Sequence, residues 1–76
     1  MLELYILDTC PFCRKVINYF DDNKIKYIKK NILDKKNLEE LMNLGGKQQV
    51  PFLVDTECDK CLYESDDIIE YVKNKV

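Results

Sequence analysis

Apolar residues recur along the chain with two different periods, which predict strands and helices in alternation. Residues 2–7 (LELYIL) are mostly apolar and predict a largely buried strand. Pro11 favours the first turn of a helix, with Thr9 or Cys10 as its cap. The next apolar residues are spaced as on one buried helix face, and they are Cys13, Val16, Ile17 and Phe20. The polar run 21–24 (DDNK) ends this helix.

Residues 25–46 predict a strand followed by a second helix. Residues 25–32 (IKYIKKNI) place lysines at outward positions, as at the edge of a sheet. Asp34 is expected to cap the helix, and Gly45-Gly46 to end it. Its buried face is predicted to comprise Leu38, Leu41 and Met42.

The remainder of the chain predicts a hairpin and a third helix. Residues 51–54 (PFLV) and 61–63 (CLY) are short strands joined by a turn at 55–60. Ser65 is expected to cap the helix, with two aspartates in the first turn. The buried face of this helix is predicted to comprise Ile68, Ile69 and Val72. The order β-α-β-α-β-β-α predicts one α/β domain over residues 1–76, with a parallel crossover and then a hairpin in a mixed sheet.

Composition excludes several classes of protein. The net charge is −2 and eleven of the twelve basic residues are lysines, so a nucleic-acid partner is not expected. No apolar run approaches the ~20 residues of a membrane span, and residues 1–8 do not resemble a signal peptide. We therefore expect a soluble, monomeric, cytoplasmic protein without a membrane partner. The absence of histidine excludes Cys-His and Ser-His-Asp catalysis and His-ligated zinc.

Residues 9–13 (TCPFC) hold the first of two Cys-x-x-Cys pairs. At a helix N-terminus Cys10 is accessible, and its pKa is expected to be lowered from about 8.5 because free backbone N–H groups and the helix dipole stabilise the thiolate. Cys13, one turn later, can resolve a mixed disulfide by intramolecular attack. We therefore predict a thiol–disulfide oxidoreductase with Cys10 as nucleophile and Cys13 as resolving thiol. A metal site, an inert cysteine pair and a secreted two-disulfide framework are the alternatives.

Three segments of the chain together resemble the glutaredoxins. The strand running into CPFC (residues 5–13) is similar to their CPYC segment, and Val50-Pro51 is similar to their Thr-Val-Pro segment with its cis proline. Residues 63–68 (YESDDI) resemble their third signature, and the three segments occur in family order over essentially the whole chain. The resemblance implies a thioredoxin fold, in which helices flank a four-stranded mixed sheet and Cys10 lies above the end of the first strand.

The resemblance also implies a glutathione-binding groove. The backbone of Val50 would pair with the cysteine of glutathione, Ser65 and Asp66 would bind its γ-glutamyl end, and Lys47 or Gln48 its glycine carboxylate. The full set of implied groove residues is Pro11, Phe12, Lys47, Gln48, Val50, Pro51, Ser65 and Asp66. Glutathione would be the reducing co-substrate, with no bound cofactor. The partners would be disulfide-containing or glutathionylated proteins.

The chain departs from the family in one charge near the first pair. Many glutaredoxins carry a lysine three residues before the first cysteine, whereas Leu7 stands there, followed by Asp8. Arg14 and Lys15 add positive charge, but a less acidic Cys10 and weaker glutathione binding are expected. One alternative is therefore a redoxin that takes electrons from thioredoxin reductase and serves an enzyme such as ribonucleotide reductase. Glutathione transferases begin with a similar domain, but these 76 residues lack their all-helical second half, so a transferase is not expected.

Cys58 and Cys61 (CDKC) form a second pair in the predicted hairpin turn. Four thiolates in two such pairs suit zinc or an iron–sulfur cluster, so a non-catalytic metal-binding module is the alternative of another class. The expected fold places the two pairs in different features, which argues against a shared metal. For Cys58 and Cys61 themselves, a second redox or regulatory pair, a metal site and no essential role all stay open.

Overall fold

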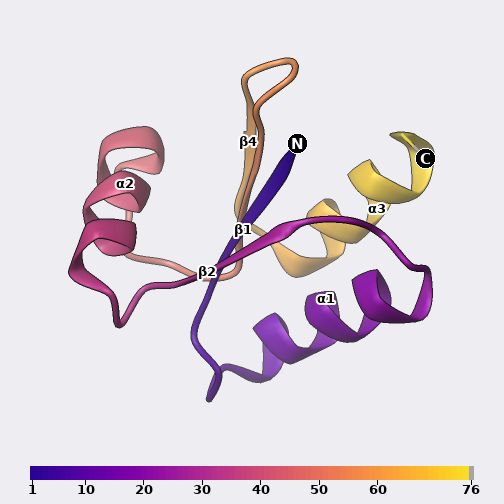
Figure 1. Ribbon diagram of the computed structural model, residues 1–76, viewed down its shortest axis with the longest axis horizontal. Helices are drawn as coiled ribbons and strands as arrows, with labels where there is room; N and C mark the ends of the chain where they lie inside the picture. Colours follow the sequence, from indigo (N-terminus) through magenta and orange to yellow (C-terminus); the bar gives the residue numbers. More distant parts are fainter. Residues whose placement is uncertain (76) are drawn as a thin grey trace.

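Every predicted strand and helix is present in the computed structural model, which describes residues 1–75 (Figure 1). The elements in chain order are β1 (Leu2–Ile6), α1 (Pro11–Asp22), β2 (Ile28–Asn31), α2 (Lys35–Gly45), β3 (Phe52–Asp55), β4 (Lys60–Leu62) and α3 (Ser65–Lys75). None of the helices in this part of the chain is long and apolar enough to cross a membrane.

The four strands form one mixed sheet in the order β2-β1-β3-β4. β1 runs parallel to β2 and antiparallel to β3, which in turn pairs antiparallel with β4. Leu4 lies opposite Leu53 in this register. The lysine-bearing strand β2 is at an edge, as its pattern predicts. The four-stranded sheet with its three helices confirms the expected thioredoxin fold.

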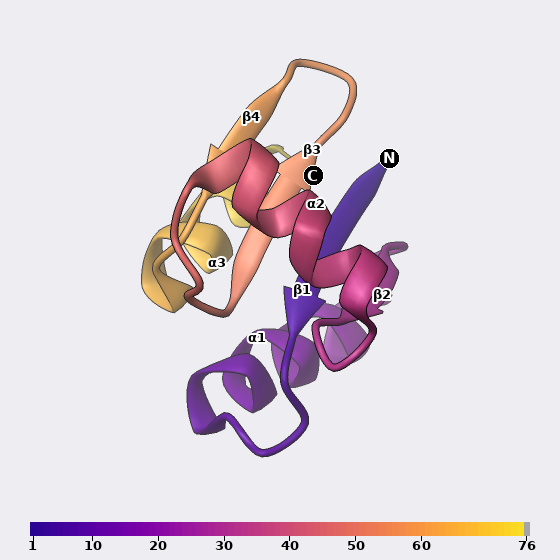
Figure 2. The same cartoon turned by 90° about the vertical axis from the view of Figure 1, so that its left-hand side faces the viewer.

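Helices cover both faces of the sheet. α1 and α3 pack side by side on one face, and α2 crosses the other face (Figure 2). The predicted face of α1 is fully buried, and it packs against β1, β3 and α3 in the larger core. The smaller core, beneath α2, comprises Tyr5, Ile32, Leu41, Phe52 and Val54. Because α1 is fixed along one whole face, its N-terminus is held firmly at the end of β1.

The ends of α2 follow the expected local chemistry. The carboxylate of Asp34 accepts a hydrogen bond from the backbone N–H of Lys36 at 3.0 Å, which makes Asp34 the N-cap. Gly46 has a φ of 80°, and its N–H donates to the carbonyl of Met42 at 3.0 Å. This left-handed conformation suits glycine, because glycine has no Cβ to clash there.

Several predicted details are wrong, for reasons that tertiary packing supplies. Met42 is 41% exposed, because α2 packs on the sheet through a narrow row of side chains centred on Leu41. Ile69 is only half-buried. The second strand begins at Ile28 rather than Ile25, since the N–H of Ile25 bonds to the carbonyl of Phe20 and stays tied to α1. The boundaries of the hairpin strands shift by one residue, and Ser65 is the first residue of α3 rather than its cap.

Candidate functional site

Cys10 caps the N-terminus of α1, just beyond the end of β1. Its φ and ψ of −83° and 118° are extended, and its sulfur accepts a hydrogen bond from the backbone N–H of Cys13 at 3.4 Å. Pro11 follows as the first helical residue. Cys10 is half-buried whereas Cys13 is fully buried, so only Cys10 presents its sulfur to a substrate. The backbone N–H and the helix dipole both favour a negative charge on that sulfur.

Cys13 belongs to the hydrophobic core as much as to the site. Burial disfavours its thiolate and raises the pKa of Cys13 to about 12, and the neighbouring Cys10 contributes in the same direction. Near neutral pH Cys13 is therefore a protonated thiol one turn behind the accessible sulfur. This arrangement suits a group that acts after Cys10 has reacted.

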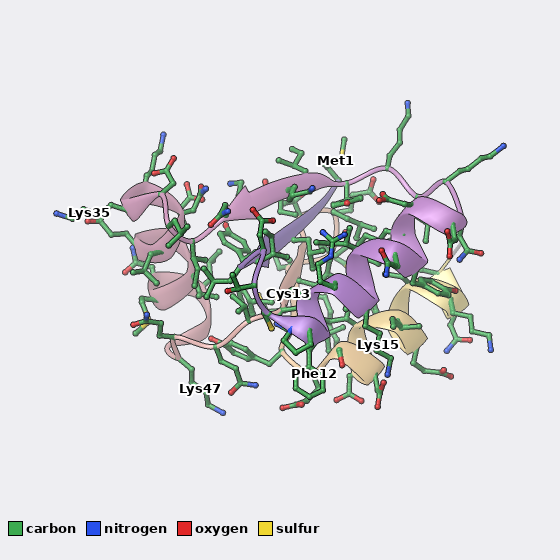
Figure 3. All side chains as sticks on the ribbon, turned by 90° about the horizontal axis from the view of Figure 1, so that it is seen from below. Met1, Phe12, Cys13, Lys15, Lys35 and Lys47 are labelled. Atoms are coloured by element: carbon green, nitrogen blue, oxygen red, sulfur yellow. The ribbon has the colours of Figure 1, made fainter. Side chains whose placement is uncertain are left out.

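A groove of about 340 Å³ lies beside Val50, the residue whose carbonyl Cys10 contacts, and Cys10 itself is not among the residues that line it. The thiol of Cys10 donates to the carbonyl of Val50 at 3.9 Å, and the Val50–Pro51 peptide bond is cis, as the resemblance implies. Five of the implied binding residues line the groove, namely Phe12, Val50, Pro51, Ser65 and Asp66. Figure 3 shows Phe12 projecting from the start of α1, and its side chain is 61% exposed.

Three further groove residues were not among the implied binding residues, although two of them belong to the segment that resembles the third signature: Gln49, Tyr63 and Glu64. The Tyr63 ring packs on Phe52 with 4.6 Å between centroids, and its hydroxyl donates to the carbonyl of Lys47 at 2.8 Å. Gln49 donates to Glu64 at 3.2 Å. Their closeness in sequence to Val50 and Ser65 was an indication in the sequence that they line the groove, but only the pairing of β3 with β4 brings them together.

The other three implied residues lie outside the lining of this groove. Pro11 fixes the turn behind Cys10, and Gln48 is exposed on the connection to β3. Lys47 places its ammonium 5.6 Å from the centroid of the Tyr63 ring. Figure 3 shows this side chain extending outward from the molecule.

Asp66 is already paired with a cation of the same chain. The Nζ of Lys15, on α1, donates to Oδ1 of Asp66, in the first turn of α3. Both side chains are exposed, with 54% and 80% of their surface accessible. The negative charge of this groove residue is therefore offset by a lysine that does not itself line the groove.

The second cysteine pair lies at the opposite end of the sheet. Val50 precedes β3 and the hairpin turn follows it, so four strand residues, roughly 13 Å at about 3.3 Å each, separate the two sites (Figure 1). This separation excludes a single metal site shared by all four thiols. Within residues 1–75, no three Cys, Asp or Glu side chains are grouped as a metal site.

Cys58 and Cys61 are both exposed and unbridged, and they face opposite sides of the hairpin. Cys61 lies opposite Val54, whose side chain belongs to the core under α2. The sulfur of Cys58 instead lies 3.1 Å from the hydroxyl of Tyr71, which α3 carries on the other face. A disulfide between them would require the turn to rearrange.

A buried carboxylate anchors this hairpin to α3. Asp55 is fully buried and accepts hydrogen bonds from Tyr71 at 2.7 Å, from Lys75 at 2.8 Å and from the backbone N–H of Glu57 at 3.1 Å. Its bonds to Lys75 and Tyr71, which outweigh the opposing effect of burial, hold the pKa of Asp55 well below its usual range. The hydrogen bond between Lys75 and Asp55 also raises the pKa of Lys75.

The fold and the cysteine site define a glutaredoxin-like protein of the thioredoxin superfamily. Residues 4–76 match the family model described as glutathione S-transferase, N-terminal domain, and the chain belongs to that family. Glutathione transferases, which the length of this chain argued against, therefore contain a domain of the same family. A curated relative, an uncharacterized glutaredoxin-like 8.6 kDa protein in the rubredoxin operon of Clostridium pasteurianum, is 32% identical over 54 residues, which are 70% of this chain and 72% of the relative.

Solved structures support the same relationship. Glutaredoxin 2 from Salmonella typhimurium, in complex with glutathione, is 32% identical with a TM-score of 0.81 over 97% of this chain and 33% of its own. Human glutathione S-transferase T1-1 is 28% identical with a TM-score of 0.84 over 99% of this chain and 32% of its own. The chain thus spans about a third of the length of each. These relatives support a thiol-based redox or glutathione-related function.

Proposed function

We propose that this chain is a glutathione-dependent thiol–disulfide oxidoreductase that reduces protein disulfides and glutathione mixed disulfides. The observation that carries the proposal is the placement of Cys10 at the N-terminus of α1. The Cys13 N–H lies on its sulfur, and the carbonyl of Val50, a residue of the groove, is 3.9 Å from that sulfur. The glutathione bound to the Salmonella relative supports the choice of reductant.

The reaction proceeds by two thiolate attacks. The Cys10 thiolate attacks one sulfur of a substrate disulfide, forms a mixed disulfide and releases the other sulfur as a thiolate. With a protein substrate, Cys13 then loses its proton, attacks the Cys10 sulfur and releases the reduced substrate. Formation of the mixed disulfide removes the Cys10 charge, and with it one of the causes that raise the pKa of Cys13.

Two glutathione molecules return the enzyme to its dithiol form. The thiolate of the first attacks the Cys10 sulfur of the Cys10–Cys13 disulfide, forms a Cys10–glutathione adduct and releases Cys13 as a thiolate. The second attacks the glutathione sulfur of that adduct, which yields oxidised glutathione and restores Cys10. In the groove, the Val50 backbone, Phe12 and the start of α3 hold the glutathione moiety. A reducing compartment such as the cytoplasm would keep all four cysteines as thiols.

A coupled assay tests this proposal. A glutathionylated peptide is supplied with reduced glutathione, glutathione reductase and NADPH, and NADPH oxidation is followed. We expect turnover in the native chain and in Cys58→Ser/Cys61→Ser, and none in Cys10→Ser. Cys13→Ser should keep reducing the glutathionylated peptide but lose the reduction of a protein disulfide. Turnover that survives Cys10→Ser would contradict the assignment.

The ion pair between Lys15 and Asp66 favours one second candidate. Since Asp66 already has a cation, and Leu7 stands where many glutaredoxins carry lysine, the donor could be thioredoxin reductase with a reductase enzyme as acceptor. Turnover with purified thioredoxin reductase and NADPH, in the absence of glutathione, would support this donor.

A further inference from the structure

Lys15 and Phe12 lie one turn apart on the same side of α1. Figure 3 shows Lys15 extending towards α3, with Phe12 near it at the start of α1. Phe12 and Asp66 both line the groove, and Lys15 reaches Asp66 from the rim. The cation is therefore positioned where a ligand would approach Asp66.

The two acids at this part of the groove both have partners. Glu64 accepts a hydrogen bond from Gln49 at 3.2 Å, and Asp66 accepts one from Lys15. A free carboxylate at this position would attract an ammonium group. Here the Nζ of Lys15 already lies on Oδ1 of Asp66, so its positive charge offsets the attraction of that carboxylate for an incoming ammonium.

We propose that Lys15 is a specificity-determining residue, which neutralises Asp66 and removes the preference of the groove for thiols that carry a free α-ammonium group. This inference rests on the proposed function, because it concerns the thiols that react with Cys10. The groove accepts low-molecular-weight thiols whose end beside α3 is neutral or anionic nearly as well as it accepts glutathione.

A variant with Cys10 as its only cysteine, Cys13→Ser/Cys58→Ser/Cys61→Ser, provides the test. It is mixed with oxidised glutathione or with the same disulfide acetylated on both α-amino groups. In each case the Cys10 thiolate forms a mixed disulfide with one half of the probe and releases the other half as a thiolate. Intact mass gives the two rate constants. Their ratio cancels any change in the intrinsic reactivity of Cys10, since the sulfur chemistry is the same.

Lys15→Ala is expected to raise the ratio of the glutathione rate to the acetylated rate by about two- to fivefold at low salt, the range typical of an exposed ion pair. The rise should vanish when Asp66→Asn is also present. Arg14→Ala is the matched control, since it removes the adjacent exposed cation of α1. We expect it to leave the ratio unchanged.

The outcomes separate the two claims. If adducts form, two results would overturn the role of Lys15 and leave the proposed function intact. One is an unchanged or lower ratio in Lys15→Ala, and the other is an equal rise when Asp66→Asn is also present. If neither probe modifies Cys10 in any variant, the proposed glutathione dependence fails and the inference fails with it.

Discussion

Asp55→Asn removes the charge of a fully buried carboxylate while keeping its size. The native carboxylate accepts bonds from Tyr71 and Lys75, and an asparagine in its place turns N–H donors towards those donors. Removing one partner of a buried ion pair costs about 3–5 kcal/mol. Lys75 is one-third exposed and can turn to water or to Glu57, 3.7 Å away, so we expect about 3 kcal/mol, at the lower end of that range. A chain of this size has a total stability of about 4–11 kcal/mol.

The effect of Asp55→Asn should depend on pH with a definite sign. The folded pKa of Asp55 is lowered, so its contribution to stability is complete above the unfolded pKa of about 3.9 and is lost as the pH falls towards the folded pKa. Below about pH 3.9 the loss is about 1.4 kcal/mol per pH unit. The difference between native chain and variant should therefore shrink from about 3 kcal/mol at pH 7 to about 1 kcal/mol near pH 2.5.

Urea unfolding followed by circular dichroism at pH 7, 4, 3 and 2.5 measures this difference. Other carboxylates titrate alike in both proteins, so they cancel in the comparison. Glu57→Gln is the matched control, because its 69%-exposed side chain touches the same lysine and should change stability by less than about 0.5 kcal/mol. A loss below about 1 kcal/mol at pH 7, or a difference that does not change with pH, would refute Asp55 as a buried ionised anchor.

Three further predictions concern the helices and the site. Gly45→Ala should destabilise the fold and slow the reaction with glutathione, because its Cβ would lie 2.7 Å from Cζ of Tyr63, and thermal melts with rate measurements would show both effects. Asp34→Ala should cost about 1 kcal/mol in urea unfolding through loss of the α2 cap, whereas an unchanged midpoint would contradict that role. In Cys10→Ser/Cys58→Ser/Cys61→Ser, which leaves Cys13 as the only thiol, iodoacetamide should alkylate Cys13 slowly at neutral pH. The rate should still rise above pH 10 because burial raises the pKa of this thiol, and a plateau below pH 9 would contradict this.

The parts of the fold that the sequence predicts are those governed by local spacing. The helical spacing through Cys13 identifies a buried face correctly, because α1 lies flat along the sheet for its whole length. Met42 has the same kind of spacing, yet it is exposed because α2 covers its face with a narrow stripe. The sequence predicts Asp55 in a turn, whereas its burial depends on Tyr71, 16 positions away, which donates a hydrogen bond to it. The pairing of Lys15 with Asp66, 51 positions apart, requires the packing of α1 against α3.

The antiparallel pairing of β1 with β3 has a consequence for synthesis of the chain. Leu2 lies opposite Asp55, so the central pair of strands can be completed only after residue 55 has left the ribosome. Contacts between residues so distant in sequence also slow folding. Cys10 and Cys13 emerge well before Val50, which contacts Cys10 in the folded chain. In the nascent chain Cys10 and Cys13 are therefore both exposed to solvent. The segments that are synthesised later complete the groove and bury Cys13.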